Sequence, residues 1–134
     1  MRMTRKKGRR RWITSGDKLT DWIFSRVIHN LNYKIEATLL KKNLREKHCK
    51  KTIELYGYID SDVISLSAAK SLHPDREAIA KTLLHEVLHN VFCPIYERNI
   101  RRLEDLIWEK LSREQIAILK SYVPRHIVKN SYTA

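Results

Sequence analysis

Apolar residues recur at helical spacing in the first third of the chain. After Thr20, a residue type that often caps a helix, apolar side chains return at steps of one to four residues, which predicts a helix over 20–31. The residues that carry this spacing are Trp22, Ile23, Val27, Ile28 and Leu31. From Tyr33 to Leu39, apolar and polar residues instead alternate, and this alternation predicts a strand with one solvated face.

The next segment is charged, and two runs rich in β-forming residues follow it. Residues 41–51 contain seven Lys, Arg or Glu residues among eleven, which predicts an exposed loop or a short solvated helix. Residues 52–59 and 63–67 flank the polar turn Asp60-Ser61-Asp62. This arrangement predicts a β-hairpin.

Two helices are predicted near the C-terminus. A helix over 97–111 has one apolar face, formed by Ile100, Leu103, Ile107 and Leu111. Another helix begins at Ser112, because Gln115 three residues later completes a capping box, and it continues until Pro124.

Between these regions, residues 75–92 form an apolar stretch that also predicts a helix. Pro74 precedes it, where a first-turn proline is tolerated, and Asp75 and Glu77 favour the positive end of a helix. Pro94 then prevents the helix from continuing.

Together these elements predict an α+β fold. We expect a short antiparallel sheet packed on the helix of residues 75–92, with two or three further helices. A chain of 134 residues is long enough for one core but not for two. The expected organisation is a basic tail over 1–11, a single domain over 12–125 and a C-terminal tail over 126–134 with little organisation.

The sequence H-E-x-x-H occurs within the helix of residues 75–92, as His85, Glu86 and His89. Histidines four residues apart project from the same side of a helix, so both imidazoles can bind one Zn²⁺. Glu86 points about 100° away, which suits a base for zinc-bound water and not a ligand. The alternative is a pair of hydrogen-bonded core histidines. The apolar surroundings favour the metal, because a buried carboxylate without a partner is strongly disfavoured.

A catalytic zinc site needs a third protein ligand, and its fourth position is left to water. The ligand class with a third histidine six residues after His89 is excluded, because position 92 is Phe and position 95 is Ile. A carboxylate from the next helix remains. Glu104 lies beside the predicted buried face of that helix, and we favour it as the third metal ligand.

Other acidic residues of this helix compete with Glu104. Asp105 is the nearest competitor, whereas Glu97 lies near the helix start and Glu109 points elsewhere. The alternative for Glu104 is an exposed acid that pairs with Arg101 or Arg102.

Several further residues have open roles. The donor to a developing oxyanion could be any of Tyr56, Tyr58, His73 and Tyr96. Two cysteines are too few for a disulfide framework, so Cys49 and Cys93 are expected to be free thiols in a reducing compartment. Cys93 is expected to be a small apolar core residue, with metal ligation as the lesser alternative.

The net charge of +12 is concentrated at the N-terminus. Residues 1–11 contain seven basic residues and no acidic one, so this tail could bind nucleic acid through phosphate contacts. A nucleic-acid-associated protein, in which the metal-binding domain is a scaffold and the tail determines location, is therefore the alternative to an enzyme. Neither a signal peptide nor a run of about 18 apolar residues is present, so we expect a cytoplasmic protein without membrane contact.

Several segments of the chain resemble one family. They are Tyr56-Gly-Tyr-Ile-Asp60, Ile64-Ser-Leu66, Thr82-Leu-Leu-His-Glu-Val-Leu-His89, and Glu104 before Leu106, Ile107 and Leu111. In these segments the chain is similar to small phage and prophage metallopeptidases related to the ImmA/IrrE group. The resemblance covers about residues 33–111. It implies a minimal zincin fold, a Zn²⁺ site of two His and one Glu, and peptidase activity in the bacterial cytoplasm.

The expected reaction is hydrolysis of a peptide bond in a protein partner. Glu86 would accept the proton as zinc-bound water attacks the carbonyl. In zinc peptidases with an H-E-x-x-H helix, a strand commonly lies along the cleft and pairs with the substrate. We expect residues 63–67, the strand nearest to the motif in sequence, to be this edge strand.

Overall fold

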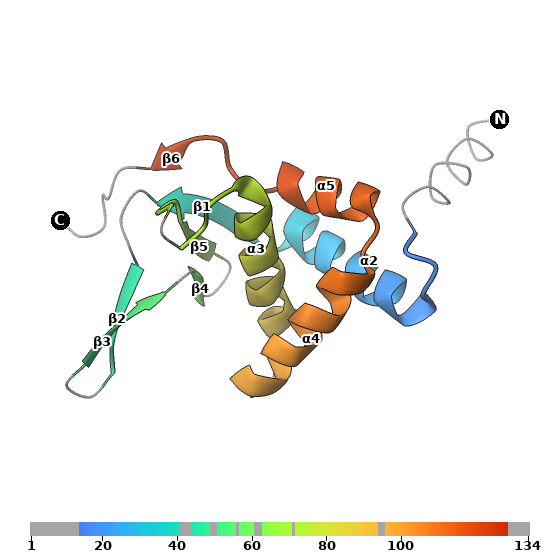
Figure 1. Cartoon of the computed structure of the whole chain (residues 1–134), viewed down its shortest axis with the longest axis horizontal. Coiled ribbons are helices and arrows are strands. Elements are labelled where there is room, and N and C mark those ends of the chain that lie inside the picture. The colour runs from blue at the N-terminus through green and yellow to red at the C-terminus, as the bar shows by residue number, and fades with distance from the viewer. Residues whose placement is uncertain are drawn as a thin grey trace.

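The computed structural model describes residues 14–40, 44–48, 51–55, 57–60, 63–70, 72–93 and 96–128. Its fold is α+β (Figure 1). In chain order the elements are α2 (Lys18–Tyr33), β1 (Glu36–Leu40), β2 (Leu44–His48), β3 (Lys51–Leu55), β4 (Gly57–Asp60), β5 (Val63–Ser67), α3 (Arg76–Val91), α4 (Glu97–Lys110), α5 (Arg113–Ser121) and β6 (Ile127–Val128). The predicted tail over 1–11 lies outside the described residues.

The strands form a mixed sheet and a separate hairpin. The four-stranded sheet has the order β4-β5-β1-β6, in which β1 runs parallel to β5 and to β6, and β4 runs antiparallel to β5. Glu36 lies opposite Val63 in the parallel pair, and Asp60 lies opposite the same residue in the antiparallel pair. Strands β2 and β3 pair only with each other among the described strands, and they extend away from the sheet (Figure 1).

The strands of the main sheet and the hairpin differ from the sequence predictions in direction and in extent. The main sheet is not antiparallel, because β1 pairs in parallel on both sides. Residues 41–51, predicted as a loop or helix, contain β2 and the first residue of β3. Residues 52–59, predicted as one strand, are divided between β3 and β4, which belong to different sheets. Alternation identifies residues that can form strands, but the pairing partner depends on contacts between distant segments. The predicted hairpin that ends with residues 63–67 is confirmed by the antiparallel pairing of β4 with β5, although only residues 57–60 form its first strand.

Helix α2 is longer at both ends than the predicted helix over 20–31. Asp17, and not Thr20, is its N-cap: the Asp17 carboxylate accepts hydrogen bonds from the backbone N and the Oγ1 of Thr20, at 2.9 and 2.5 Å. At the other end Tyr33 is the last helical residue, so the strand begins at Glu36.

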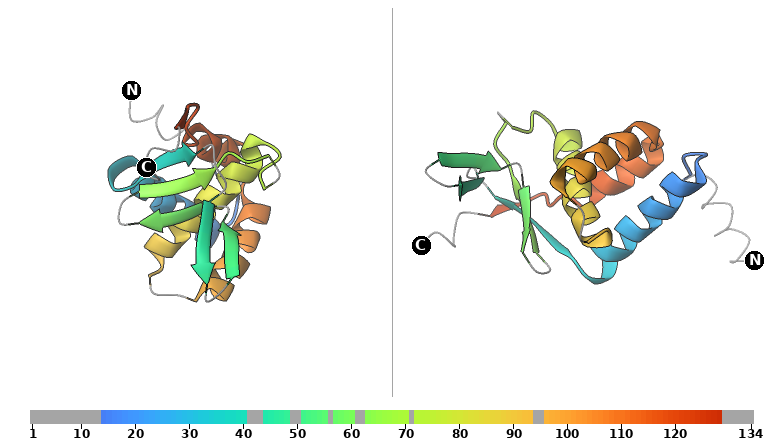
Figure 2. Two further views of the ribbon diagram at one scale, coloured as in Figure 1. Left: turned by 90° about the vertical axis from the view of Figure 1, so that its left-hand side faces the viewer. Right: turned by 90° about the horizontal axis from the view of Figure 1, so that it is seen from below.

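Helix α3 lies between the strands and the other helices (Figures 1 and 2). Its Leu83, Leu84, Val87 and Leu88 are fully buried. A helix that is apolar on most sides must be covered on most sides, and α2, α4, α5, β4 and β5 all contact α3. The predicted helix over 75–92 is confirmed, with Asp75 as the N-cap that accepts a hydrogen bond from the backbone N of Ala78.

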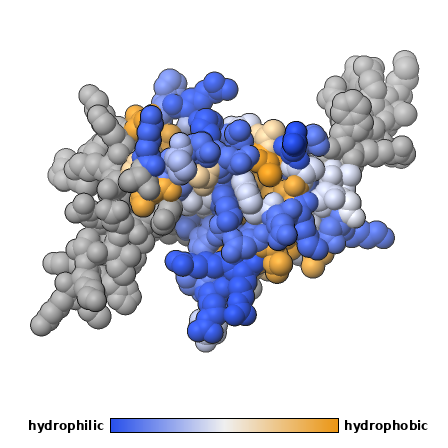
Figure 3. Space-filling view, viewed as in Figure 1, coloured by the Kyte–Doolittle hydropathy of each residue, from blue (hydrophilic) through white to orange (hydrophobic). Residues whose placement is uncertain are grey.

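Helices α4 and α5 also confirm their predicted positions. On α4, Ile100 and Ile107 are buried, whereas the outer side is hydrophilic (Figure 3). The capping box of Ser112 and Gln115 begins α5. None of the described helices combines the length and the apolar character that a membrane crossing requires.

The C-terminal region is more organised than the sequence predicts. Ile127 and Val128, within the predicted tail over 126–134, form β6 and pair with Leu39 and Leu40 of β1. The side chain of Arg76, at the start of α3, donates hydrogen bonds to backbone carbonyls at the C-terminal end of α5. These contacts hold the final segment against the domain.

A partly buried polar contact joins the beginnings of α2 and α5. The Asp21 carboxylate accepts hydrogen bonds from Gln115 Nε2 at 2.9 Å, from the backbone N and the Oγ of Ser15 at 2.8 Å each, and from Thr14 Oγ1. Burial opposes ionisation of Asp21, but these donors outweigh it and lower the pKa to about 2. The carboxylate therefore links two helices that are distant in sequence.

We predict that Asp21→Asn lowers the free energy of unfolding by about 1 kcal/mol at pH 7, because the amide cannot accept all of these hydrogen bonds. A depressed folded-state pKa stabilises the fold above the unfolded value near 3.8 and loses this effect as the pH falls toward about 2. In urea unfolding, the difference from wild type should therefore shrink between pH 4 and pH 2. Glu109→Gln, on the exposed side of α4, is the matched control; an equal loss there would contradict the assignment.

Candidate metal centre

The last two turns of α3 bring the imidazoles of His85 and His89 together. Their Nε2 atoms are 3.2 Å apart and their ring centroids 4.9 Å apart. The His85 side chain is 13% exposed and that of His89 is 26% exposed, so the pair lies at the surface end of an otherwise buried helix side. The helical spacing of four residues positions both rings for a common ligand.

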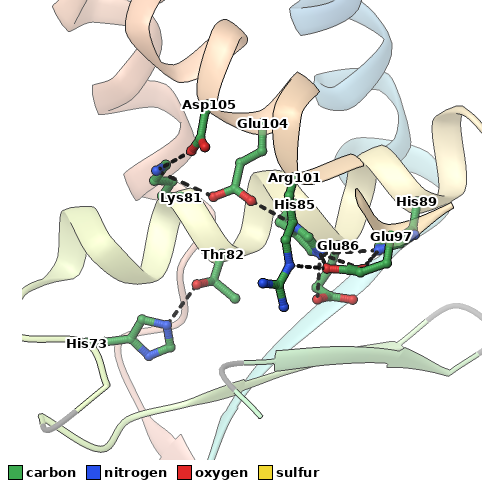
Figure 4. Close-up of polar contacts among 10 residues, drawn as sticks. All are labelled: His73, Lys81, Thr82, His85, Glu86, His89, Glu97, Arg101, Glu104 and Asp105. Atoms are coloured by element: carbon green, nitrogen blue, oxygen red, sulfur yellow. Dashed lines mark hydrogen bonds and ion pairs between the residues drawn. The ribbon is translucent and has the colours of Figure 1, made fainter. Parts of the chain in front are cut away.

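A carboxylate from the start of α4 completes this cluster (Figure 4). Glu97 Oε1 lies 2.7 Å from His89 Nε2 and 3.2 Å from His85 Nε2. One ligand atom from each of these three residues lies within 4.8 Å of the other two. The second oxygen of Glu97 accepts a hydrogen bond from Arg101 Nε at 2.7 Å, which holds the carboxylate in place.

Glu104, favoured from the sequence as the third ligand, occupies a different position. Its Oε1 lies 2.6 Å from His85 Nδ1, the ring nitrogen that does not face Glu97 and His89. Its other oxygen lies 3.7 Å from Lys81 Nζ. Histidine ligands commonly bind the metal with one nitrogen and donate the other N–H to a carboxylate, and Glu104 has the position of that carboxylate. The structure therefore brings Glu97, and not Glu104, to the shared face of the two imidazoles.

The sequence contains a signal that could have identified Glu97. Only five residues, 92–96, separate α3 from α4, and a short connection makes consecutive helices antiparallel neighbours. The first turn of α4 must then lie beside the last turn of α3, where His89 is. Glu104 is also not the exposed acid of the alternative interpretation, because its side chain is 15% exposed, and Arg101 bonds to Glu97.

Glu86 lies beside the cluster and is buried, with 8% of its surface exposed. Its Oε2 is 4.0 Å from His85 Nε2. Burial raises the pKa of Glu86 to about 7, and the carboxylates of Glu97 and Glu104 add to the effect, while His85 opposes it. A carboxyl group with this pKa can bind and release a proton near neutral pH.

Neighbouring charges of opposite sign shift the pKa values of His85 and Glu97. Burial lowers the pKa of His85, but Glu104, Glu97 and Glu86 outweigh it and raise the pKa overall. Burial disfavours ionised Glu97, but Arg101 and the two imidazoles outweigh it and lower its pKa. Three carboxylates around two imidazoles thus create a strong preference for positive charge, which a proton or a metal cation can satisfy.

His73, one of the open candidates for an oxyanion donor, is engaged elsewhere. Its buried ring lies between the backbone carbonyl of Ser67 and the Oγ1 of Thr82, each 2.8 Å from a ring nitrogen. Burial lowers the pKa of His73, although the bond to Ser67 opposes this shift. The ring joins the end of β5 to α3, and this position indicates a structural role.

The remaining candidates are exposed or lie outside the described residues. Tyr96 is 84% exposed and immediately precedes Glu97. Cys93 is exposed and is not the core residue expected from the sequence, because α3 ends before it, at Val91. The side chains of Tyr56 and Tyr58, and all of Cys49, lie outside the described part of the chain.

The strand expected to form the substrate edge is not at an edge. Strand β5 has β4 on one side and β1 on the other, so its backbone groups are already paired. Strands β4 and β6 are the outer strands of this sheet, and β4 also packs against α3. Because β5 also pairs with β1, the earlier strand of the β4–β5 pair lies outside.

Comparison of the chain with known protein families, with curated proteins and with solved structures finds no match.

We predict that Glu86→Gln stabilises the metal-free protein at pH 8. The pKa of Glu86 in the folded state, about 7, lies above its ordinary value of 4.5, so its contribution to stability is complete below pH 4.5 and is lost as the pH rises through about 7. At pH 8 the wild type therefore carries a cost of up to about 3 kcal/mol that the amide avoids.

Urea unfolding in the presence of a chelator measures this effect. The gain should be largest at pH 8 and nearly absent at pH 4.5, and Glu109→Gln should show no such pH dependence. A Glu86→Gln protein that is no more stable than wild type at pH 8 would contradict the claim that ionised, buried Glu86 destabilises the folded protein.

Proposed function

We propose that this chain is a zinc-dependent metallopeptidase with a minimal zincin-like fold. The observation that carries the proposal is the convergence of His85, His89 and Glu97, with the buried Glu86 beside them. Two imidazole nitrogens and one carboxylate oxygen are the ligand types of catalytic zinc sites that retain an open position. In this proposal Glu97 takes the ligand role that the sequence favoured for Glu104.

The side chains around the metal site have different roles in the proposed reaction. A bound zinc ion would supply Lewis-acid activation of water and of the substrate carbonyl. Glu86 accepts the proton of the attacking water and then passes it to the departing amine, so that the peptide bond breaks into a carboxylate and an amine. Its buried position, with Oε2 4.0 Å from His85 Nε2, supports this role. Glu104 orients His85, and Arg101 orients Glu97.

The outer strand β4 supports a peptide as the substrate. It has one free edge among the described strands and packs against the helix that carries the cluster. An extended peptide could therefore add to this edge as a further strand, with backbone hydrogen bonds that place it along α3. A protein partner in a phage or bacterial setting is suggested by the family resemblance alone. The nucleic-acid alternative rests on the charge of residues 1–11, outside the described residues, and stays a prediction.

We predict that the purified protein binds about one zinc per chain and that Glu86→Gln keeps the zinc but loses cleavage. Removal of a positioned general base typically costs 10²–10⁴ in rate, so turnover should fall by about 10³. Zinc content by elemental analysis and cleavage of a mixed fluorogenic peptide library measure the two effects. Glu109→Gln is the control that should retain both. Cleavage by Glu86→Gln at the wild-type rate would exclude Glu86 as the base.

We also predict that Glu97→Gln weakens zinc binding more than Glu104→Gln. Loss of a direct ligand should cost more than the roughly 10–100-fold that loss of an orienting carboxylate costs. Competition with a fluorescent zinc chelator measures both variants under the same conditions. The reverse order of effects would return the third-ligand role to Glu104.

A further inference from the structure

Lys81 and His85 are four residues apart on α3, and both meet the carboxylate of Glu104 on α4 (Figure 4). One oxygen, Oε1, lies 2.6 Å from His85 Nδ1, while Oε2 lies 3.7 Å from Lys81 Nζ. The Glu104 side chain is 15% exposed and that of Lys81 35%, so the contact is partly shielded from water. The hydrogen-bonding distance to His85 on one oxygen and the ion pair with Lys81 on the other restrict the orientation of the Glu104 carboxylate.

We propose that Lys81 is a positioning residue of the metal centre: it holds Glu104 so that this carboxylate presents His85 with Nε2 toward Glu97 and His89. The expected effect on zinc affinity rests on the proposed function. The orientation of the His85 ring does not, because it can be measured in the metal-free protein. Figure 4 joins Lys81 to Glu104 and Asp105 and to none of the three clustered residues, so Lys81 acts on the cluster through Glu104.

The chemistry of imidazole explains why this orientation matters. A neutral imidazole carries one N–H, and its other nitrogen has the lone pair that a metal requires. When Nδ1–H donates to Glu104, Nε2 is left unprotonated on the side of Glu97 and His89. Without a fixed acceptor at Nδ1, the ring could protonate at Nε2 or rotate, and either change would remove a ligand atom from the cluster.

Lys81 is in turn held by a second acid. Asp105 Oδ1 lies 2.8 Å from Lys81 Nζ, and this hydrogen bond raises the pKa of Lys81, although partial burial opposes the shift and Glu104 adds to it. The ammonium is therefore charged and anchored between two neighbouring carboxylates of α4. Successive contacts therefore connect exposed Asp105 through Lys81 and Glu104 to His85 of the imidazole pair.

A simple ion pair between α3 and α4 is the competing explanation, and zinc affinity together with the ring tautomer distinguishes the two. Lys81→Met retains most of the aliphatic chain but removes the charge. We expect it to weaken zinc binding by up to about 10-fold in chelator competition, the lower end of the cost of losing a partner that contacts a metal ligand, because Lys81 acts through that partner, Glu104. In ¹⁵N histidine NMR of metal-free protein, at a pH where the rings are neutral, His85 should change from the Nδ1–H form to a mixture. Lys81→Arg should preserve both properties, and Lys110→Met, at the end of α4, is the matched control.

The outcomes separate this inference from the proposed function. Unchanged zinc affinity and an unchanged His85 tautomer in folded Lys81→Met would overturn the positioning role, even if wild type binds zinc. Equal losses in Lys81→Met and Lys110→Met would also overturn it, because the effect would then be one of general charge. If wild type binds no zinc, the proposed function fails, and the tautomer in Lys81→Met alone still decides whether Lys81 positions the ring.

Discussion

Burial of α3 on most of its sides is the constraint on which the site depends. Four leucine and valine side chains in its middle, Leu83, Leu84, Val87 and Leu88, have no exposed surface, so the helix has a fixed rotation about its axis. With the rotation fixed, His85 and His89 must face α4, and Glu86 must lie in the covered region beside them. The polar residues of a buried helix need polar partners, and α4 supplies them as carboxylates.

Electrostatics connects these partners into one unit. Glu86 is costly to ionise because burial and neighbouring carboxylates act in the same direction, whereas Glu97 is easily ionised because Arg101 and two imidazoles surround it. Neighbouring acids with pKa values shifted in opposite directions can take different roles at the same pH. This division is the physical basis for treating one as a base and the other as a ligand in the proposed peptidase.

Much of the helical structure follows from local sequence signals. The cap at Asp75, the capping box of Ser112 and Gln115, and the apolar spacing of each helix lie within a few residues of the structure they specify. The H-E-x-x-H spacing likewise places both imidazoles on one side of the helix without reference to the rest of the chain. Alternation and β-forming residues also identified the strands near residues 33–39, 52–59 and 63–67, although β2 and β6 were missed, and alternation does not encode direction or neighbours.

The sequence by itself therefore determined the helices, the α+β class and the pairing of His85 with His89 on one helical face. Only the tertiary structure decided that β1 and β5 are parallel and that β4, and not β5, is an outer strand. It also decided that Glu97 joins the imidazoles while Glu104 bonds to the far nitrogen of His85. The physical reason is the range of the interactions. Helix caps and spacing act within a turn or two, whereas strand order and the choice between two acids on α4 depend on how that helix crosses α3.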